Sequence, residues 1–224
     1  MNALSSAAES SGDGIIDDPL FARIAADIYD TGYSVIRGAL PATLTTLLSL
    51  SQAQLKKRDY SEAGIGRLAE HQTLSTIRND EVCWIDGSTG GGKAWLNWTE
   101  GLRHYLNCHL FMGLFSFESH FAHYAPGHFY KRHYDAFKGR SNRVLSVVTY
   151  LNDDWQQDDG GELVLYQNND DNRGVRVLPE TGTLVVFLSE KFPHEVLPAA
   201  RHRFSVAGWY RVNDSLNGRV DPPR

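Results

Sequence analysis

Two metal-binding residue types stand one residue apart in the segment KRHYDAF, residues 131–137, which contains His133 and Asp135. Successive side chains of a β-strand alternate between its two faces, so this pair would project from the same side of a strand. Such a pair is either a solvated polar face or two corners of a metal site. Enzymes that use Fe(II) commonly hold it with two histidines and one carboxylate, which leaves other positions on the metal open. A second histidine is therefore needed to complete the site.

His194 is the candidate for that third ligand. It follows the apolar run GTLVVFL, residues 182–188, and opens a strand-like segment of its own. Arg203 comes nine residues later, at the start of RFSVAGWY, where alternation places it on one face with Ser205 and Ala207. An arginine aimed into a β core is costly unless it meets an anion, and a guanidinium binds a carboxylate in a fixed geometry. The spacing therefore predicts a metal site beside a binding site for a dicarboxylate.

Other histidines are rival ligands. His120, His123 and His128 lie close together in HFAHYAPGH, but they lack an adjacent carboxylate and a following arginine. We therefore expect these three to have packing or solvent-facing roles. His202, beside Arg203, would point to the opposite face of its strand and is expected to be exposed.

The composition is that of an ordinary soluble globular protein. The 224 residues are 42% hydrophobic and 22% charged, enough for one good core and one domain. A net charge of -5 argues against a general nucleic-acid or membrane-surface binder. Cys83 and Cys108 are too few for a disulfide framework, and the sequence shows no secretory signal and no apolar run of about 20 residues. The expected location is the cytoplasm.

The chain changes character near its middle. Helical periodicity and capping residues predict helices from Pro19 to the residue before Gly32, over 41–58, and from Ala94 to about Met112. Residues 59–80 have little periodicity and are expected to form a long loop. From Phe117 onward, eight short β-type runs are separated by Gly, Pro, Asn and Asp, which is typical of a sandwich, barrel or jelly roll. The fold class expected is α+β.

The segment GSTGGGKA, residues 87–94, matches the phosphate-loop pattern G-x-x-x-x-G-K. Ala94 occupies the position where Ser or Thr would bind magnesium, and no parallel α/β alternation follows. We therefore interpret this segment as a flexible glycine-rich turn.

Several linked motifs, covering roughly residues 60–212, resemble those of 2-oxoglutarate- and Fe(II)-dependent dioxygenases. The order H-x-D…H-x₈-R is similar to the metal and cosubstrate motif of that family. More narrowly, the chain resembles prolyl 4-hydroxylases of the hypoxia-factor (egl-nine) type and their bacterial relatives. The motifs that carry this resemblance are YAPGHFYKRHYD, VVTYLNDDW, GGELVLY, PHEVLPAARHRFSVAGWY and the loop TIRNDEVCWIDG.

The resemblance implies a fold and a set of site residues. The fold would be a double-stranded β-helix (jelly-roll) core of antiparallel strands, with N-terminal helices packed against it. The metal ligands would be His133, Asp135 and His194, and Arg203 would complete the catalytic set. The residues implied to bind the cosubstrate are Arg203, Tyr124, Tyr150 and Trp209, and those implied to bind substrate are Arg78, Asp80, Arg143 and Tyr130, with Arg140 as the rival of Arg143.

Plainer interpretations of these residues stay open at this point. Aromatic side chains are expected in half-buried strands, so the four aromatic residues of the site could simply belong to the core. Arg78 and Asp80 could equally be a solvated ion pair on a loop. The run AFKGRSNR, after the metal pair, differs in length and content from that of the animal enzymes.

Composition and periodicity, together with the resemblance, give an expected domain organisation. Residues 1–14 would be disordered, residues 15–212 would form a single dioxygenase domain, and residues 213–224 would be a polar tail. Within the domain, residues 15–112 would give helical support, residues 117–212 the β-helix core, and residues near 59–86 a mobile loop.

The implied activity is hydroxylation of a prolyl residue in a protein, coupling O₂ and 2-oxoglutarate to hydroxyproline, succinate and CO₂. Fe(II), 2-oxoglutarate and O₂ would be required, with ascorbate as a reductant. For bacterial relatives the resemblance points to elongation factor Tu as the protein partner, with a role in oxygen sensing, and the chain is expected to be monomeric. The alternative is hydroxylation of a small molecule such as a free amino acid.

Overall fold

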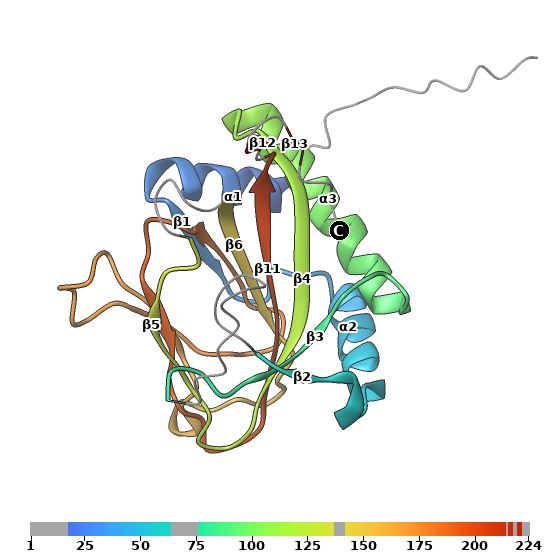
Figure 1. The fold of residues 1–224 in the computed structure, drawn as a ribbon, viewed down its shortest axis with the longest axis vertical. Coiled ribbons are helices and arrows are strands. Elements are labelled where there is room, and N and C mark those ends of the chain that lie inside the picture. Colours follow the sequence, from blue (N-terminus) through green and yellow to red (C-terminus); the bar gives the residue numbers. More distant parts are fainter. Residues whose placement is uncertain (1–17, 64–75, 137–141, 214, 217–218, 221–224) are drawn as a thin grey trace, which may run out of the picture.

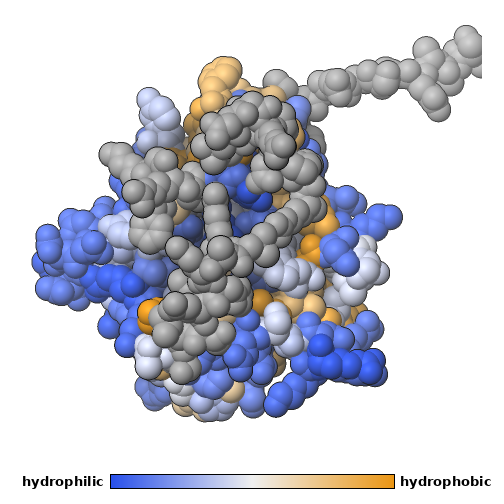
Figure 2. Space-filling model, viewed as in Figure 1, coloured by the Kyte–Doolittle hydropathy of each residue, from blue (hydrophilic) through white to orange (hydrophobic). Residues whose placement is uncertain are grey.

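The computed structural model describes residues 18–63, 76–136, 142–213, 215–216 and 219–220 (Figure 1). Within these residues, no helix is both long and apolar enough to cross a membrane. Hydrophilic side chains dominate the described surface on the face shown in Figure 2. Residues 1–14 and residues 64–75 of the expected mobile loop lie outside the described residues, and the expected division into domains stays a prediction.

Three α-helices come from the first half of the chain: α1 (Pro19–Asp30), α2 (Ala42–Gln54) and α3 (Gly90–Leu110). α1 begins where the sequence predicts, because the Asp18 carboxylate accepts the backbone N–H of Leu20 at 2.8 Å and Pro19 needs no N–H partner in the first turn. Short 3₁₀ turns occupy Lys57–Asp59 and Gln157–Asp159.

Two helix boundaries differ from the predictions. α2 ends at Gln54, so the basic residues expected in its last turn lie beyond the helix. The predicted glycine-rich turn is wrong in part, because Gly90, Gly91 and Gly92 form the first turn of α3. Thr89 caps this helix by accepting the Gly92 N–H at 3.0 Å, and a β-carbon on Gly91 would lie 2.2 Å from the carbonyl oxygen of Leu47. Glycine is needed there because α2 and α3 approach closely.

A seven-stranded antiparallel sheet forms the centre of the molecule, in the order β1-β9-β6-β11-β4-β3-β2. Its strands are β1 (Tyr33–Ile36), β2 (Ser61–Glu62), β3 (Glu81–Trp84), β4 (Leu114–Tyr124), β6 (Arg143–Tyr150), β9 (Leu184–Leu188) and β11 (Arg203–Val212). A four-stranded antiparallel sheet, β5-β10-β7-β8, packs against it. Its strands are β5 (Tyr130–His133), β7 (Leu163–Leu165), β8 (Val175–Val177) and β10 (His194–Val196). A short pair, β12 (Ser215–Leu216) and β13 (Arg219–Val220), follows β11.

The sheet separates two hydrophobic cores. On one face, α1, α2 and α3 pack on outward-facing residues such as Leu145 and Val206. On the other face, residues such as Val185 and Phe187 meet the four-stranded sheet. Figure 1 shows α2 and α3 on the side of the sheet away from β5. This arrangement confirms the predicted jelly-roll core with N-terminal helices packed against it.

Candidate active site

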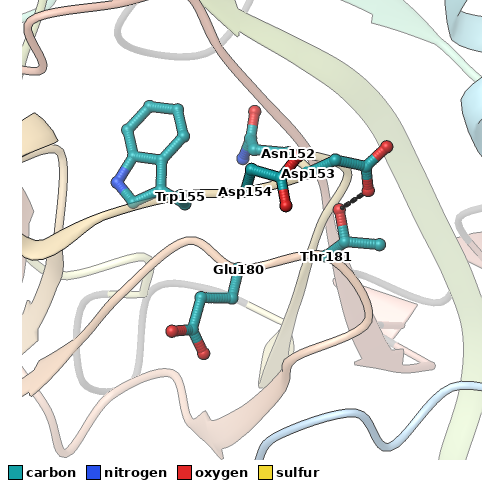
Figure 3. A pocket seen from close by; sticks show the side chains of 6 residues that line it. All are labelled: Asn152, Asp153, Asp154, Trp155, Glu180 and Thr181. Atoms are coloured by element: carbon teal, nitrogen blue, oxygen red, sulfur yellow. Dashed lines mark hydrogen bonds between the residues drawn. The ribbon is translucent and has the colours of Figure 1, made fainter.

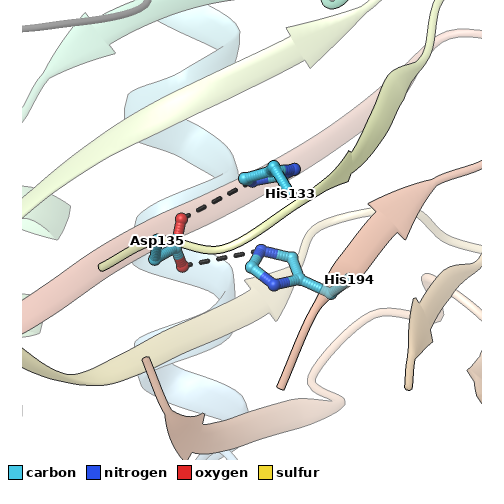
Figure 4. A group of neighbouring side chains, drawn as sticks. All are labelled: His133, Asp135 and His194. Atoms are coloured by element: carbon cyan, nitrogen blue, oxygen red, sulfur yellow. Dashed lines mark ion pairs between the residues drawn. The ribbon is translucent and has the colours of Figure 1, made fainter. Parts of the chain in front are cut away.

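Neighbouring strands of the four-stranded sheet and the bend after β5 bring His133, Asp135 and His194 together (Figure 4). His133 is the last residue of β5 and His194 the first of β10, and the two face each other in the antiparallel register. Oδ1 of Asp135 lies 3.6 Å from Nε2 of His133, and Oδ2 lies 3.5 Å from Nε2 of His194. One ligand atom from each residue falls within 4.8 Å of the others. The spacing is suited to three ligands of one metal ion.

Asp135 reaches this position differently from the prediction. The sequence predicts His133 and Asp135 on one strand, but β5 ends at His133 and Asp135 lies in the bend that follows. The bend, rather than strand alternation, turns the carboxylate back toward the imidazoles.

Backbone carbonyls orient both imidazoles. Nδ1 of His133 lies 2.8 Å from the carbonyl oxygen of Lys131, and Nδ1 of His194 lies 3.1 Å from that of Phe192. A carbonyl only accepts, so each Nδ1 carries the proton and each Nε2 presents a lone pair toward the carboxylate. Metal-binding histidines are typically held in this way.

The charges suit a divalent cation. Burial lowers the pKa of His194 to about 4, so its imidazole is neutral at pH 7. Burial alone would raise the pKa of Asp135, but His194, His133 and the hydrogen bond from Ser146 outweigh it and hold that pKa well below its usual value. Neutral imidazole nitrogen and ionised carboxylate oxygen are the donors that Fe(II) takes in oxygenases. The residues present therefore fit the metal implied by the sequence.

Arg203 is a buried cation whose side chain makes only neutral contacts. Only 1% of the residue is exposed; its Nε donates to the Gly161 carbonyl at 2.8 Å and its Nη1 donates to Ser205 Oγ at 3.3 Å. Within the described residues no carboxylate pairs with it. A buried charge in this state is costly, and an incoming anion would remove that cost.

Two tyrosine rings flank this guanidinium. The rings of Tyr124 and Tyr150 each have their centroid 5.0 Å from the Arg203 guanidinium carbon. The Tyr150 hydroxyl is buried and makes no well-aligned hydrogen bond. Burial raises the pKa of Tyr150 to about 12 and that of Tyr124 well above its usual value, so both remain protonated donors. Together with Arg203 they form a cradle for a carboxylate.

A glycine fixes the direction of the arginine. Gly161 has φ of +72°, a conformation that favours glycine. A β-carbon there would lie 2.9 Å from the β-carbon of Ala199 and 3.3 Å from Cδ of Arg203. Its carbonyl, which accepts from the guanidinium, can therefore approach only because no side chain stands in between.

Trp209 and Arg143 lie on neighbouring strands on the same face. The Arg143 guanidinium stacks on the Trp209 ring at 3.7 Å and pairs with Glu118, with Nη2 to Oε1 at 2.8 Å. Trp209 lies opposite Ser146 in the register of β11 and β6, and its Nε1 is buried without a partner. The rival residue, Arg140, lies outside the described residues.

Arg78 and Asp80 form a buried ion pair. Nη2 of Arg78 lies 2.6 Å from Oδ2 of Asp80, and the Asp80 side chain has no exposed surface. The interpretation of a solvated loop pair is therefore wrong. The Arg78 guanidinium lies 4.2 Å from the Tyr130 ring centroid, and that ring stacks on His133 with centroids 3.5 Å apart. A continuous stack thus joins the loop pair to the metal ligands.

The rival histidines are used elsewhere. His120 is buried, and its ring packs against Trp84 and Trp209, with centroids 5.2 and 5.4 Å away. His123 contacts Glu81 through Nδ1 and His202 through Nε2. His202 is exposed, as predicted.

Sequence reasoning missed Ser146. Its hydroxyl donates to Oδ2 of Asp135 at 2.6 Å. A signal was present, because Ser146 interrupts the apolar run VLSVV and shares a period of two with Val148 and Tyr150.

A separate open pocket of about 540 Å³ lies at the loop after β6, lined by Asn152, Asp153, Asp154, Trp155, Glu180 and Thr181 (Figure 3). Its polar groups serve the fold: Thr181 donates to Asp153 at 2.8 Å, and the Asn152 amide donates to the Pro179 carbonyl at 2.8 Å. None of the predicted site residues lines it.

Comparisons with known proteins agree with this geometry. The family model of the 2OG-Fe(II) oxygenase superfamily matches residues 119–211. A crystal structure of a Pseudomonas putida prolyl-4-hydroxylase is 39% identical, with a TM-score of 0.76, and the match covers 87% of this chain and 100% of that one. The chain therefore belongs to the 2OG-Fe(II) oxygenase superfamily.

Within that superfamily, the chain is similar to prolyl hydroxylases. One solved structure is a Trichoplax adhaerens prolyl hydroxylase in complex with a peptide fragment of the hypoxia inducible factor oxygen degradation domain. It is 28% identical to this chain with a TM-score of 0.74, and the match covers 86% of this chain and 89% of that one. The Caenorhabditis elegans hypoxia-inducible factor prolyl hydroxylase is 24% identical over 84% of this chain and 28% of that protein. Human Egl nine homolog 1 is 26% identical over 65% of this chain and 36% of that protein. The chain thus spans about a third of the length of these curated relatives.

Proposed function

We propose that this protein is an Fe(II)- and 2-oxoglutarate-dependent prolyl 4-hydroxylase that acts on a prolyl residue in a protein substrate. The observation that carries the proposal is the buried Arg203 guanidinium, which has no carboxylate partner within the described residues. Arg203 lies on β11, on the face of the seven-stranded sheet that is turned toward the four-stranded sheet, whose strands β5 and β10 carry His133 and His194. A metal site alone would not need such a cation, whereas a dicarboxylate cosubstrate would supply its missing counter-ion. The prolyl hydroxylases among the relatives give the reaction.

Each residue has a distinct part in this proposal. His133, Asp135 and His194 would hold the iron, and Arg203 with the Tyr124 hydroxyl would hold the far carboxylate of 2-oxoglutarate. Tyr150 would close the cradle from the other side, and Trp209 would border it near the metal. When bound, iron and 2-oxoglutarate supply the oxidising chemistry that places one oxygen atom of O₂ on the substrate.

The remaining residues would bind the substrate chain. Arg78 lies over Tyr130, which stacks directly on His133, so a group held by these two side chains would be next to the metal. Asp80 would hold Arg78 in place, since its own carboxylate is covered. Arg143, stacked on Trp209, would line the same face from the adjacent strand.

The cofactor part is tested by anaerobic titration with Fe(II) and then 2-oxoglutarate. We expect the weak visible charge-transfer band of the bound chelate, lost in His133→Ala and weakened in Arg203→Ala. A metal-binding protein without an oxygenase site would give no such band with the unmodified protein, and that result would contradict the proposal.

The substrate part is tested by mass spectrometry of candidate proteins. We expect the gain of one oxygen atom on a proline, dependent on both iron and 2-oxoglutarate, and elongation factor Tu is the first candidate. Oxidation of free amino acids or other small molecules alone would favour the alternative substrate class.

Arg78→Ala separates the two substrate classes. It should lower hydroxylation of a protein substrate by about tenfold, the size expected for loss of one well-placed contact. Conversion of 2-oxoglutarate to succinate without substrate should be unchanged. Arg176→Ala, which removes an exposed ion pair with Glu162, is the matched control and should change neither rate.

A further inference from the structure

We propose that Ser146 and Ser189 are positioning residues that fix the Asp135 carboxylate for metal binding. This inference rests on the metal site of the proposed function, but it concerns side chains outside the ligand set. Ser146 Oγ lies 2.6 Å from Oδ2 of Asp135 and 2.9 Å from Oγ of Ser189. The three groups form one continuous chain of hydrogen bonds.

The number of available protons determines which group donates in each of these hydrogen bonds. An ionised carboxylate only accepts, so the Ser146 hydroxyl must use its single proton on Asp135. The remaining contact of Ser146 is then as an acceptor, and Ser189 must be the donor. Donation therefore runs one way, from Ser189 through Ser146 to the carboxylate, and each bond polarises the next.

Both serines are buried, which makes each bond matter more. Ser189 has no exposed surface and Ser146 is 1% exposed. A buried hydroxyl that loses its partner is left unsatisfied, which costs free energy. Among the described residues, Ser146 is the one hydrogen-bond donor to Asp135, because the two facing imidazole nitrogens present lone pairs.

The pair also joins the segments that carry the ligands. Asp135 lies in the bend after β5, whereas Ser189 follows β9 and opens the short segment that leads to His194. Ser189 is itself fixed, because its N–H donates to the Val144 carbonyl of β6 at 3.0 Å. The two hydroxyls therefore link both ligand segments to the rigid central strand β6. Ser146 acts directly on the carboxylate, and Ser189 acts through Ser146.

The test is the affinity of the folded protein for metal alone. Fe(II) is titrated anaerobically into the unmodified protein, Ser146→Ala and Ser189→Ala, and Mn(II) binding is followed by electron paramagnetic resonance. Ser146→Ala should weaken metal binding by about 10- to 100-fold, the usual effect of removing a partner of a ligand. Ser189→Ala should weaken it less, because the Ser146 bond to Asp135 remains.

Thr149→Val is the matched control. Thr149 lies on the same strand but faces the helices, where its buried hydroxyl donates to the Thr183 carbonyl at 3.0 Å. This variant also loses one buried hydrogen bond, yet its metal affinity should equal that of the unmodified protein. Circular dichroism confirms that all variants are folded before titration.

Two results would overturn the inference: unchanged metal affinity in Ser146→Ala, or an equal loss in Ser146→Ala and Thr149→Val, which would mark a general loosening of the sheet. Failure of the unmodified protein to bind metal would instead overturn the metal site of the proposed function, and the role of the serines with it.

Discussion

The two faces of the seven-stranded sheet are built from alternate residues of the same strands, yet they differ sharply in chemistry. Toward the helices, β6 and β11 present apolar side chains such as Leu145, Val147 and Val206, all fully buried. Toward the four-stranded sheet, the intervening positions hold Ser146 and Arg203. Burial of apolar side chains on one face stabilises the fold, whereas burial of polar groups on the other face lowers part of that stability.

Hydrogen bonds stabilise most of the polar groups that are buried at this second face. The histidines that the four-stranded sheet contributes opposite it are bound to backbone carbonyls, and Asp135 is bound to a serine of this face. The Arg203 guanidinium has no carboxylate partner within the described residues, and the buried hydroxyl of Tyr150 makes no well-aligned hydrogen bond. A bound carboxylate would complete the hydrogen bonding of these two groups.

The largest expected effect comes from removing a metal ligand that lies opposite the polar face. His133→Ala should weaken Fe(II) binding by more than about 100-fold, beyond the effect of changes around the ligands. Anaerobic titration measures it. Unchanged affinity would mean that the three side chains do not bind the metal.

Arg203→Met should separate binding from stability. We expect at least about 100-fold weaker 2-oxoglutarate binding, because a buried charge pair broken on one side costs about 3–5 kcal/mol. The melting temperature of the free protein should rise, since an apolar side chain replaces a buried cation without a carboxylate partner. Calorimetry measures both. A lower melting temperature would show that the neutral contacts of Arg203 fully compensate its charge.

Leu145→Ala tests the helix-facing core one residue away from Ser146. Leu145 has no exposed surface, so the change should lower the free energy of unfolding by about 2–5 kcal/mol. Chemical denaturation measures this value. Metal affinity should stay unchanged, and a large loss would show that the two faces are coupled rather than independent.

The smallest effect concerns pH. Burial lowers the pKa of His120 to about 4, below the usual value of about 6.5. Between these values the unfolded chain binds a proton that the folded protein does not, so the contribution of His120 to stability falls as the pH drops. The loss at pH 5 relative to pH 8 should be on the order of 2 kcal/mol. Denaturation of metal-free His120→Leu should show a weaker pH dependence, and an identical dependence would contradict the prediction.

Much of this site could be predicted from the sequence because its signals are local. Alternation in RFSVAGWY places Arg203 and Ser205 on one face, and the register with β4 and β6 brings Tyr124 and Tyr150 beside the arginine. His194 was identifiable from its spacing to Arg203.

Other features depend on contacts between distant segments. The bond from Ser146 to Asp135 forms only when the two sheets pack together, and the bond from Ser189 to Ser146 forms only when β6 and β9 pair. The sequence pattern predicts a turn for the glycines at the start of α3. Glycine is required there because two helices pack closely, and a local pattern does not reveal that packing. Burial of the Arg78 and Asp80 pair likewise follows from packing on Tyr130.

The positive φ of Gly161 has a consequence for redesign. The carbonyl oxygen of Gly161 sets the direction of the Arg203 guanidinium. A larger side chain at position 161 would collide with Ala199 before it could change that direction. Attempts to make the protein accept a shorter or longer keto acid should therefore leave the guanidinium and its glycine alone. The adjustable walls are the two phenol rings, whose size and reach set how much room the acid has.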